Sequence, residues 1–124
     1  MGDGDGADDG DGKMTYLKAK TKYRLGKFYH LTAVYDGKTM ELYVNGKKES
    51  QSKEQSGDLL YPDSAPYVIG AYQDANEFHP HHGRIREVQV YGEAAKAEWV
   101  AKEFAHNESL ATEKWNEAEP SFQV

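Results

Sequence analysis

The sequence contains no cysteine among its 124 residues, which excludes a disulfide framework and any metal or catalytic site built on thiolates. It has no run of about 18 apolar residues, so no membrane-spanning helix is expected. Lys and Arg number 15 against 21 Asp and Glu; nucleic acid is therefore not an expected partner, because phosphate binding requires clustered cations. An apolar signal segment is also missing from the first residues, and we expect the chain to follow such a segment or to be cut from something longer.

The first 13 residues, MGDGDGADDGDGK, have almost no apolar side chain. Such a segment cannot bury enough surface to offset its chain entropy, and we predict a flexible acidic linker. A calcium loop is the alternative, because the aspartates offer hard oxygen ligands. Counted from Asp3, however, an EF-hand loop would have Ala7 at its fifth position and Met14 at its twelfth, so the register fails.

A strand-like pattern is clearest over residues 28–49, FYHLTAVYDGKTMELYVNGKKE. Apolar and polar residues alternate with period two, and aromatic residues are frequent, which predicts β-strands. Asp36-Gly37 and Asn45-Gly46 stand at the joints, where they supply the positive φ of tight hairpins. The pattern predicts a three-stranded antiparallel meander.

The remaining elements are predicted from weaker patterns. A short edge strand is expected at residues 16–20, and further strands at residues 67–72 and 84–91, with a bulge near Arg86 and Glu87. Residues 94–105 are rich in Ala, Glu and Lys, and Trp99, Val100 and Phe104 share one apolar sector, which predicts a helix. Residues 107–124 are predicted to be a polar tail.

Two segments together resemble the laminin-G-like family of the concanavalin A-like lectin/glucanase superfamily. GKFYHLTAVYDGKTMELYVNGK is similar to the family's aromatic-His strand, Asp-Gly turn and LYVNGK strand, and PYVIGAY followed by GRIREVQVYGEAAKAEWVAKEF is similar to its last strands and closing helix. Phe28 stands where the family usually has Trp, and Arg86 where Asp is frequent. The resemblance covers roughly residues 26–105.

The resemblance implies an all-β fold, an antiparallel jelly-roll sandwich with one short C-terminal helix. Only about half of the family's strands can be found, so we expect an incomplete sandwich, the C-terminal portion of a domain, at residues 14–106. Unpaired sheet edges recruit other strands, and we expect pairing with a strand-donating chain or a neighbouring domain. The expected function is non-catalytic recognition of a glycan or an extracellular protein within a larger secreted or periplasmic protein. The alternative is a structural accessory domain that packs on a catalytic domain and has no ligand.

An enzyme is not expected. Glucanases of the related scaffold place paired carboxylates on one strand, and the corresponding residues 84–91 have Glu87 as their only acid. No cofactor is required. Zinc or copper at His79, His81 and His82 is less expected than a solvated loop, because adjacent histidines in extended backbone point to opposite sides. The candidates for sugar stacking are Tyr29, Tyr43 and Tyr72, and those for calcium are Asp74, Asn76 and Glu77.

Overall fold

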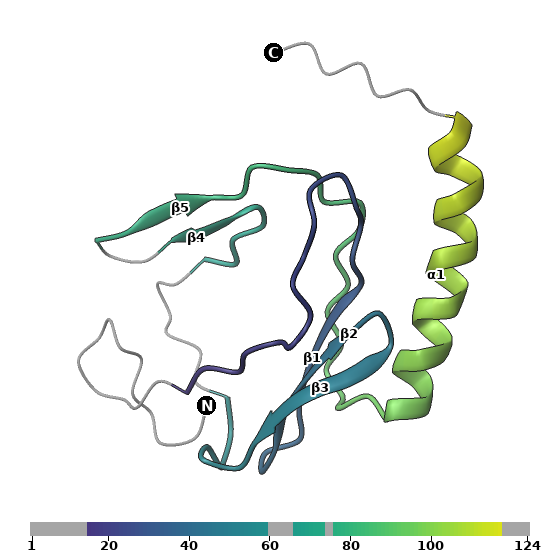
Figure 1. Cartoon of the computed structure of the whole chain (residues 1–124). Helices are drawn as coiled ribbons and strands as arrows, with labels where there is room; N and C mark the ends of the chain where they lie inside the picture. Colours follow the sequence, from purple (N-terminus) through teal and green to yellow (C-terminus); the bar gives the residue numbers. More distant parts are fainter. Residues whose placement is uncertain (1–14, 60–65, 74–75, 118–124) are drawn as a thin grey trace.

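The computed structural model describes residues 15–59, 66–73 and 76–117. In this part of the chain, two antiparallel sheets and one C-terminal helix are present (Figure 1). The three-stranded sheet has the order β1-β2-β3, and the two-stranded sheet pairs β4 with β5. The elements are β1 (Leu31–Tyr35), β2 (Met40–Val44), β3 (Lys47–Ser52), β4 (Ala71–Gln73), β5 (Phe78–Pro80) and α1 (Ala97–Glu117).

Local turn chemistry builds the three-stranded sheet, and the predicted meander is confirmed. Between β1 and β2, Oδ1 of Asp36 accepts hydrogen bonds from the backbone N–H groups of Lys38 (2.9 Å) and Thr39 (2.7 Å). Between β2 and β3, Asn45 and Gly46 have φ of 49° and 77°. Two successive positive φ values are what a two-residue hairpin loop needs to match the twist of its strands.

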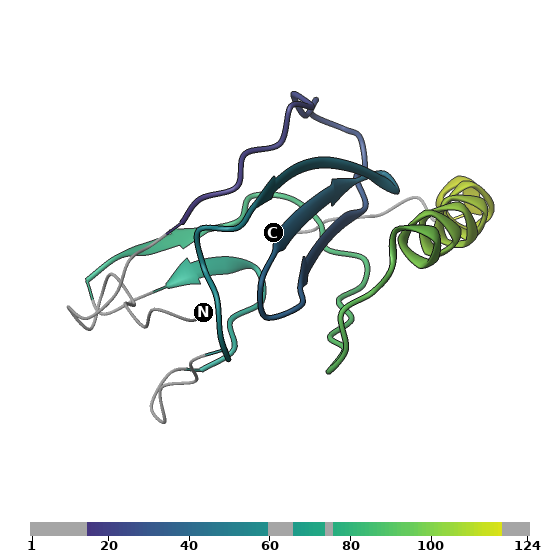
Figure 2. The same ribbon diagram turned by 90° about the horizontal axis from the view of Figure 1, so that it is seen from below.

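The core lies where the sheet meets the helix. Tyr43, Val44 and Val100 have exposed fractions of 2%, 5% and 0%. Adjacent strand residues point to opposite faces, so both faces of the sheet are covered at this end of β2. Figures 1 and 2 show α1 beside the β2–β3 turn, with the β4–β5 hairpin on the other side of the three-stranded sheet.

Close approach of two backbones fixes the helix against this turn. A Cβ atom added to Gly46 would lie 3.0 Å from Cβ of Phe104 and 3.3 Å from Cα of Ala101. The rings of Phe104 and His30 are 6.0 Å apart. The glycine therefore serves both the positive φ of the turn and the packing of α1.

Three predicted strands differ from the structure. Residues 15–19 form no strand; instead, Glu49 on β3 accepts hydrogen bonds from the backbone N–H groups of Lys20 (2.7 Å) and Thr21 (2.9 Å), so this segment is tied to the sheet through a side chain. Of the strand predicted at residues 67–72, only residues 71 and 72 are in a strand, as part of β4. Residues 84–91 are not paired as a strand among the described residues, so the bulge predicted near Arg86 and Glu87 is not formed. A separate register shift lies opposite Leu42 and Tyr43 of β2 and leaves Glu49 of β3 as the extra residue.

The predicted helix is present, but its bounds differ. It begins at Ala97 instead of Ala94 and continues to Glu117, into the region expected to be a polar tail. Asn107 does not end the helix because its amide donates to the carbonyl of Glu103, one turn earlier (3.0 Å). Among the described helices, none is long and apolar enough to cross a membrane.

Candidate ligand-binding site

The β4–β5 hairpin places two exposed rings side by side. Tyr72 on β4 is the register partner of His79 on β5, so both side chains project from the same face. Their ring centroids are 6.2 Å apart, and the ring planes are inclined by 26°. Tyr72 has an exposed fraction of 48%. We call this pair the aromatic platform.

The surroundings of the aromatic platform supply polar groups. Oε1 of Glu77 lies 4.0 Å from Nε2 of His79, and both side chains are more than half exposed. A flat aromatic surface with polar groups at its rim can pack against the apolar C–H face of a sugar ring and hydrogen-bond its hydroxyls. Gln73 and Phe78 form the next register pair of the hairpin and therefore face the opposite side.

The other two candidate tyrosines do not join this platform. Tyr29 is half-buried, its phenolic oxygen accepts a hydrogen bond from the backbone N–H of Arg24 (2.9 Å), and Nζ of Lys27 lies 5.3 Å from its ring centre. Tyr43 is 2% exposed, so its ring offers no surface for stacking. Tyr43, a predicted candidate for sugar stacking, is therefore unavailable to a ligand, because both faces of β2 are covered at this position.

Two of the three predicted calcium ligands lie among the residues that the structure describes. Asn76 and Glu77 are exposed and follow one another just before β5. Asp74 lies outside the described residues. Within the ranges that are described, no group of three or more His, Asp or Glu side chains is close enough to hold a metal ion. A calcium site at 74–77 therefore stays a prediction.

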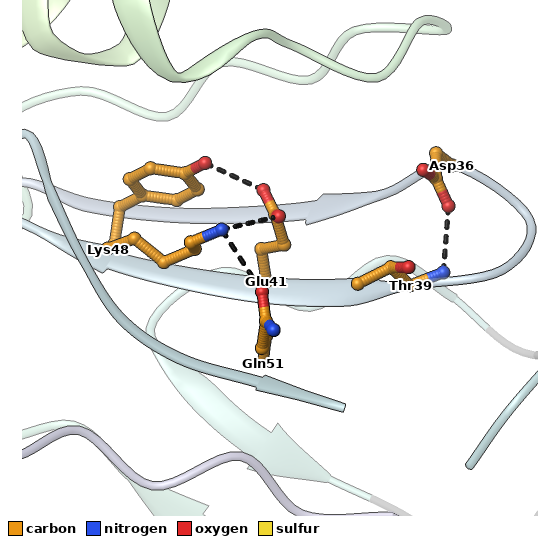
Figure 3. A network of polar contacts seen from close by, with 6 residues as sticks. Asp36, Thr39, Glu41, Lys48 and Gln51 are labelled. Atoms are coloured by element: carbon orange, nitrogen blue, oxygen red, sulfur yellow. Dashed lines mark hydrogen bonds and ion pairs between the residues drawn. The ribbon is translucent and has the colours of Figure 1, made fainter. Parts of the chain in front are cut away.

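The carboxylate of Glu41 on β2 is structural in character. Glu41 accepts hydrogen bonds from the phenol of Tyr43 (2.6 Å) and from Nζ of Lys48 (3.0 Å), and Lys48 also donates to Gln51 (3.0 Å) (Figure 3). The bond from Tyr43 and then that from Lys48 hold the pKa of Glu41 below its ordinary value. A carboxylate with a depressed pKa and two committed donors is a poor general acid.

Sequence reasoning missed a second exposed aromatic pair, Tyr91 and Trp99. Their ring centroids are 5.1 Å apart, and the two ring planes are nearly perpendicular. They line an open groove of about 410 Å³ together with charged side chains from Glu93, Lys96, Glu98 and Lys102. Tyr91 ends an extended segment and Trp99 lies in the first turns of α1, so no periodicity within one element could have joined them.

The comparisons with known proteins agree with this architecture. Residues 5–101 match the laminin G type family model of the Concanavalin A-like lectin/glucanases superfamily. The chain belongs to this superfamily. The predicted resemblance and the all-β fold class are thereby confirmed. The match begins inside the acidic segment, upstream of the range over which the motifs could be recognised.

Pappalysin-1 is among the curated relatives. The mouse protein is 42% identical and the human protein 40% identical over 50 residues, which are 40% of this chain and 3% of each relative. A structural relative is an S-layer domain-containing protein from Clostridium thermocellum, with a TM-score of 0.60 and 18% identity. The similarity covers 71% of this chain and 44% of that one. The chain therefore spans a small part of the curated relatives and less than half of the structural one, in line with an incomplete sandwich.

Proposed function

We propose that this domain is a non-catalytic recognition module that binds a carbohydrate on the aromatic platform of Tyr72 and His79. The observation that carries the proposal is the near-parallel arrangement of two exposed rings on one face of the β4–β5 hairpin. Membership of a superfamily named for lectins and glucanases supports a glycan ligand. We also propose that the domain is located outside the cytoplasm. The structural relative is an S-layer domain-containing protein, which supports this location.

A hydrolytic role is less well supported than recognition. Domains of the laminin G type are generally non-catalytic. Glu87, the only acid of residues 84–91, accepts a hydrogen bond from Gln89 at 2.5 Å. A two-carboxylate mechanism needs a second acid about 5–10 Å away across the scissile bond, and no second acid is present on this segment.

The test is a glycan-array screen of the purified chain, run with calcium and with a chelator, followed by titration calorimetry on any sugar that binds. Tyr72→Ala removes one ring of the platform and should weaken binding by about tenfold or more, equivalent to roughly 1.4 kcal/mol. Phe78→Ala is the matched control, because Phe78 is 61% exposed on the same hairpin but belongs to the register pair that faces the other way.

The outcomes separate the two functions that remain. Binding that is lost in Tyr72→Ala and kept in Phe78→Ala supports the platform. Binding that needs calcium and is lost in Glu77→Gln would place the ion at residues 74–77. A folded chain that binds no glycan, or one that binds equally well without Tyr72, contradicts the proposal. If no glycan binds, the accessory role is preferred, and the curated relatives carry the matching segment within much longer chains.

A further inference from the structure

The stretch that precedes β1 has the densest positive charge of the chain. Residues 14–35 contain no Asp or Glu. Five of the 15 Lys and Arg residues fall within residues 18–27, which are all exposed, and we call these residues the basic loop. Among the described residues, no ion pair involves any of the five cations. These cations are Lys18, Lys20, Lys22, Arg24 and Lys27.

The turn of the basic loop presents an apolar tip. Leu25 has an exposed fraction of 94%, and Tyr23 has one of 80%. Gly26 has φ of 76°, a conformation that favours glycine and reverses the chain directly after Leu25. Figure 2 shows the dark trace that leads into β1 as a loop at the outer edge of the molecule. The leucine therefore meets solvent in the midst of cations.

Contacts at both ends hold the basic loop in this shape. The hydroxyl of Tyr29 accepts a hydrogen bond from the backbone N–H of Arg24 across the turn (2.9 Å), and Nζ of Lys27 lies 5.3 Å from the centre of the same ring. At the other end, Glu49 accepts hydrogen bonds from the backbone N–H groups of residues 20 and 21. A loop that is held in place before it binds loses less conformational entropy on binding.

We propose that the basic loop binds the surface of an anionic phospholipid bilayer, with Leu25 inserted among the lipids and the neighbouring cations on the headgroups. An exposed apolar residue among cations is suited to this role, because burial of apolar surface and attraction to anionic lipid both favour binding. A sulfated polysaccharide would pair with the cations, but it offers no apolar phase for Leu25. The aromatic platform lies on the β4–β5 hairpin, so this inference does not rest on glycan binding.

The negative charge of the whole chain is compatible with this contact. The formal net charge is −6 at pH 7, but the Debye length is about 8 Å at physiological ionic strength. Carboxylates farther than this from the lipid surface are largely screened, whereas cations that touch the headgroups are not. Each Lys or Arg near an anionic surface strengthens binding about fivefold. The local charge of the basic loop therefore decides the attraction.

Flotation of the full chain with vesicles tests the proposal. The chain should bind vesicles of phosphatidylserine mixed with phosphatidylcholine at low salt, and should bind far less to phosphatidylcholine alone or at high salt. Leu25→Gln should weaken binding by about tenfold, because the apolar side chain is lost without a change of charge. Ile69→Gln is the matched control, since Ile69 is 67% exposed outside the basic loop.

A second pair of variants tests the position of the charge. Lys22→Gln with Arg24→Gln should weaken binding to the anionic vesicles by about twentyfold. Lys38→Gln with Lys102→Gln removes the same charge from exposed positions outside the basic loop, and it should change binding little.

The absence of cysteine allows the tip to be observed directly. A solvent-sensitive dye attached to Leu25→Cys should shift its emission to shorter wavelength when phosphatidylserine vesicles are added, because the dye enters a less polar environment. The same dye on Ile69→Cys should show no shift. This readout reports insertion into the bilayer, which attraction between charges alone would not produce.

Any of three results contradicts the proposal. The first is a chain that stays unbound by anionic vesicles at low salt; binding to dextran sulfate in that case would assign the cations to a sulfated polysaccharide. The second is an unshifted dye on Leu25→Cys, which would show that the tip remains in water. The third is an equal loss of binding in the two double variants, which would mean that total charge, and not the basic loop, drives the contact.

Discussion

The phenolic oxygen of Tyr43 donates a hydrogen bond of 2.6 Å to Oε2 of Glu41, its neighbour two residues earlier on β2. The ring is 2% exposed, so this hydroxyl is almost fully removed from water and depends on the carboxylate as its partner. Burial, followed by the hydrogen bond to Glu41 and its negative charge, raises the pKa of Tyr43 to about 12. The pair therefore couples the stability of the sheet to pH at both ends of the scale.

Tyr43→Phe should remove the alkaline part of this coupling. Because the pKa of Tyr43 is about 12 in the folded chain against an ordinary 10.0, its contribution is complete below pH 10 and is lost as pH rises through 12. We expect the variant to be about 1–2 kcal/mol less stable at neutral pH. Urea unfolding from pH 8 to pH 12 should show that the difference in unfolding free energy between the unmodified chain and the variant becomes smaller. A difference that stays constant would mean that the phenol titrates normally.

Glu41→Gln should remove the dependence of the sheet's stability on pH in the acidic range. The hydrogen bond from Tyr43 and then that from Lys48 lower the pKa of Glu41 below its ordinary value of 4.5. A depressed carboxylate pKa gives stability that is present above pH 4.5 and is lost as pH falls through the lower value in the folded chain. We expect a loss of about 1 kcal/mol at pH 7, which becomes smaller in denaturant titrations as pH falls below 4.5. Gln51→Ala, which touches only Lys48 in this network, should show no such pH dependence.

Gly46→Ala should detach α1 from the sheet. The residue has φ of +77°, and the added Cβ would meet Phe104 and Ala101 of the helix. We expect destabilisation of about 3 kcal/mol, since a positive φ alone costs an L-residue roughly 1–2 kcal/mol. Gly26→Ala is the control for the dihedral angle, with φ of +76° and nothing within 4 Å of its Cβ. If thermal unfolding shows equal losses for both variants, contact with the helix contributes nothing.

The elements predicted well from the sequence are those fixed by neighbouring residues. The β1–β2 and β2–β3 turns follow from Asp36-Gly37 and Asn45-Gly46, whose side-chain and φ preferences act over four residues. The exposed position of Tyr72 is also a local feature, because this residue lies on the short strand β4 of a two-stranded hairpin.

The elements predicted poorly depend on distant parts of the chain. Alternation shows that Tyr43 and Val44 point to opposite faces, but not that both faces are covered. Residues 84–91 have the pattern of a strand and the extended backbone of one, yet pairing needs a partner that the described residues do not provide. The extension of α1 beyond Ala105 relies on Asn107 bonding the preceding turn, an arrangement that its poor helix propensity does not suggest.

Glu49→Gln should free the segment that precedes β1. Glu49 accepts hydrogen bonds from the side chain of Thr21 and from the backbone N–H groups of Lys20 and Thr21, and these bonds, led by those from Thr21, lower its pKa. Both amides should be protected from hydrogen exchange above pH 4.5 and should lose protection as pH falls through the lower pKa of the folded chain, because the protonated carboxyl is a weaker acceptor.

In the Glu49→Gln variant, exchange at Lys20 and Thr21 should be fast at neutral pH. Glu54→Gln is the control, because Glu54 accepts a hydrogen bond from the hydroxyl of Thr15 and leaves these two amides untouched. Exchange measured by NMR should therefore rise at Lys20 and Thr21 in the first variant and stay unchanged in the second. Equal protection in Glu49→Gln and the unmodified chain would show that the segment is held by contacts other than this carboxylate.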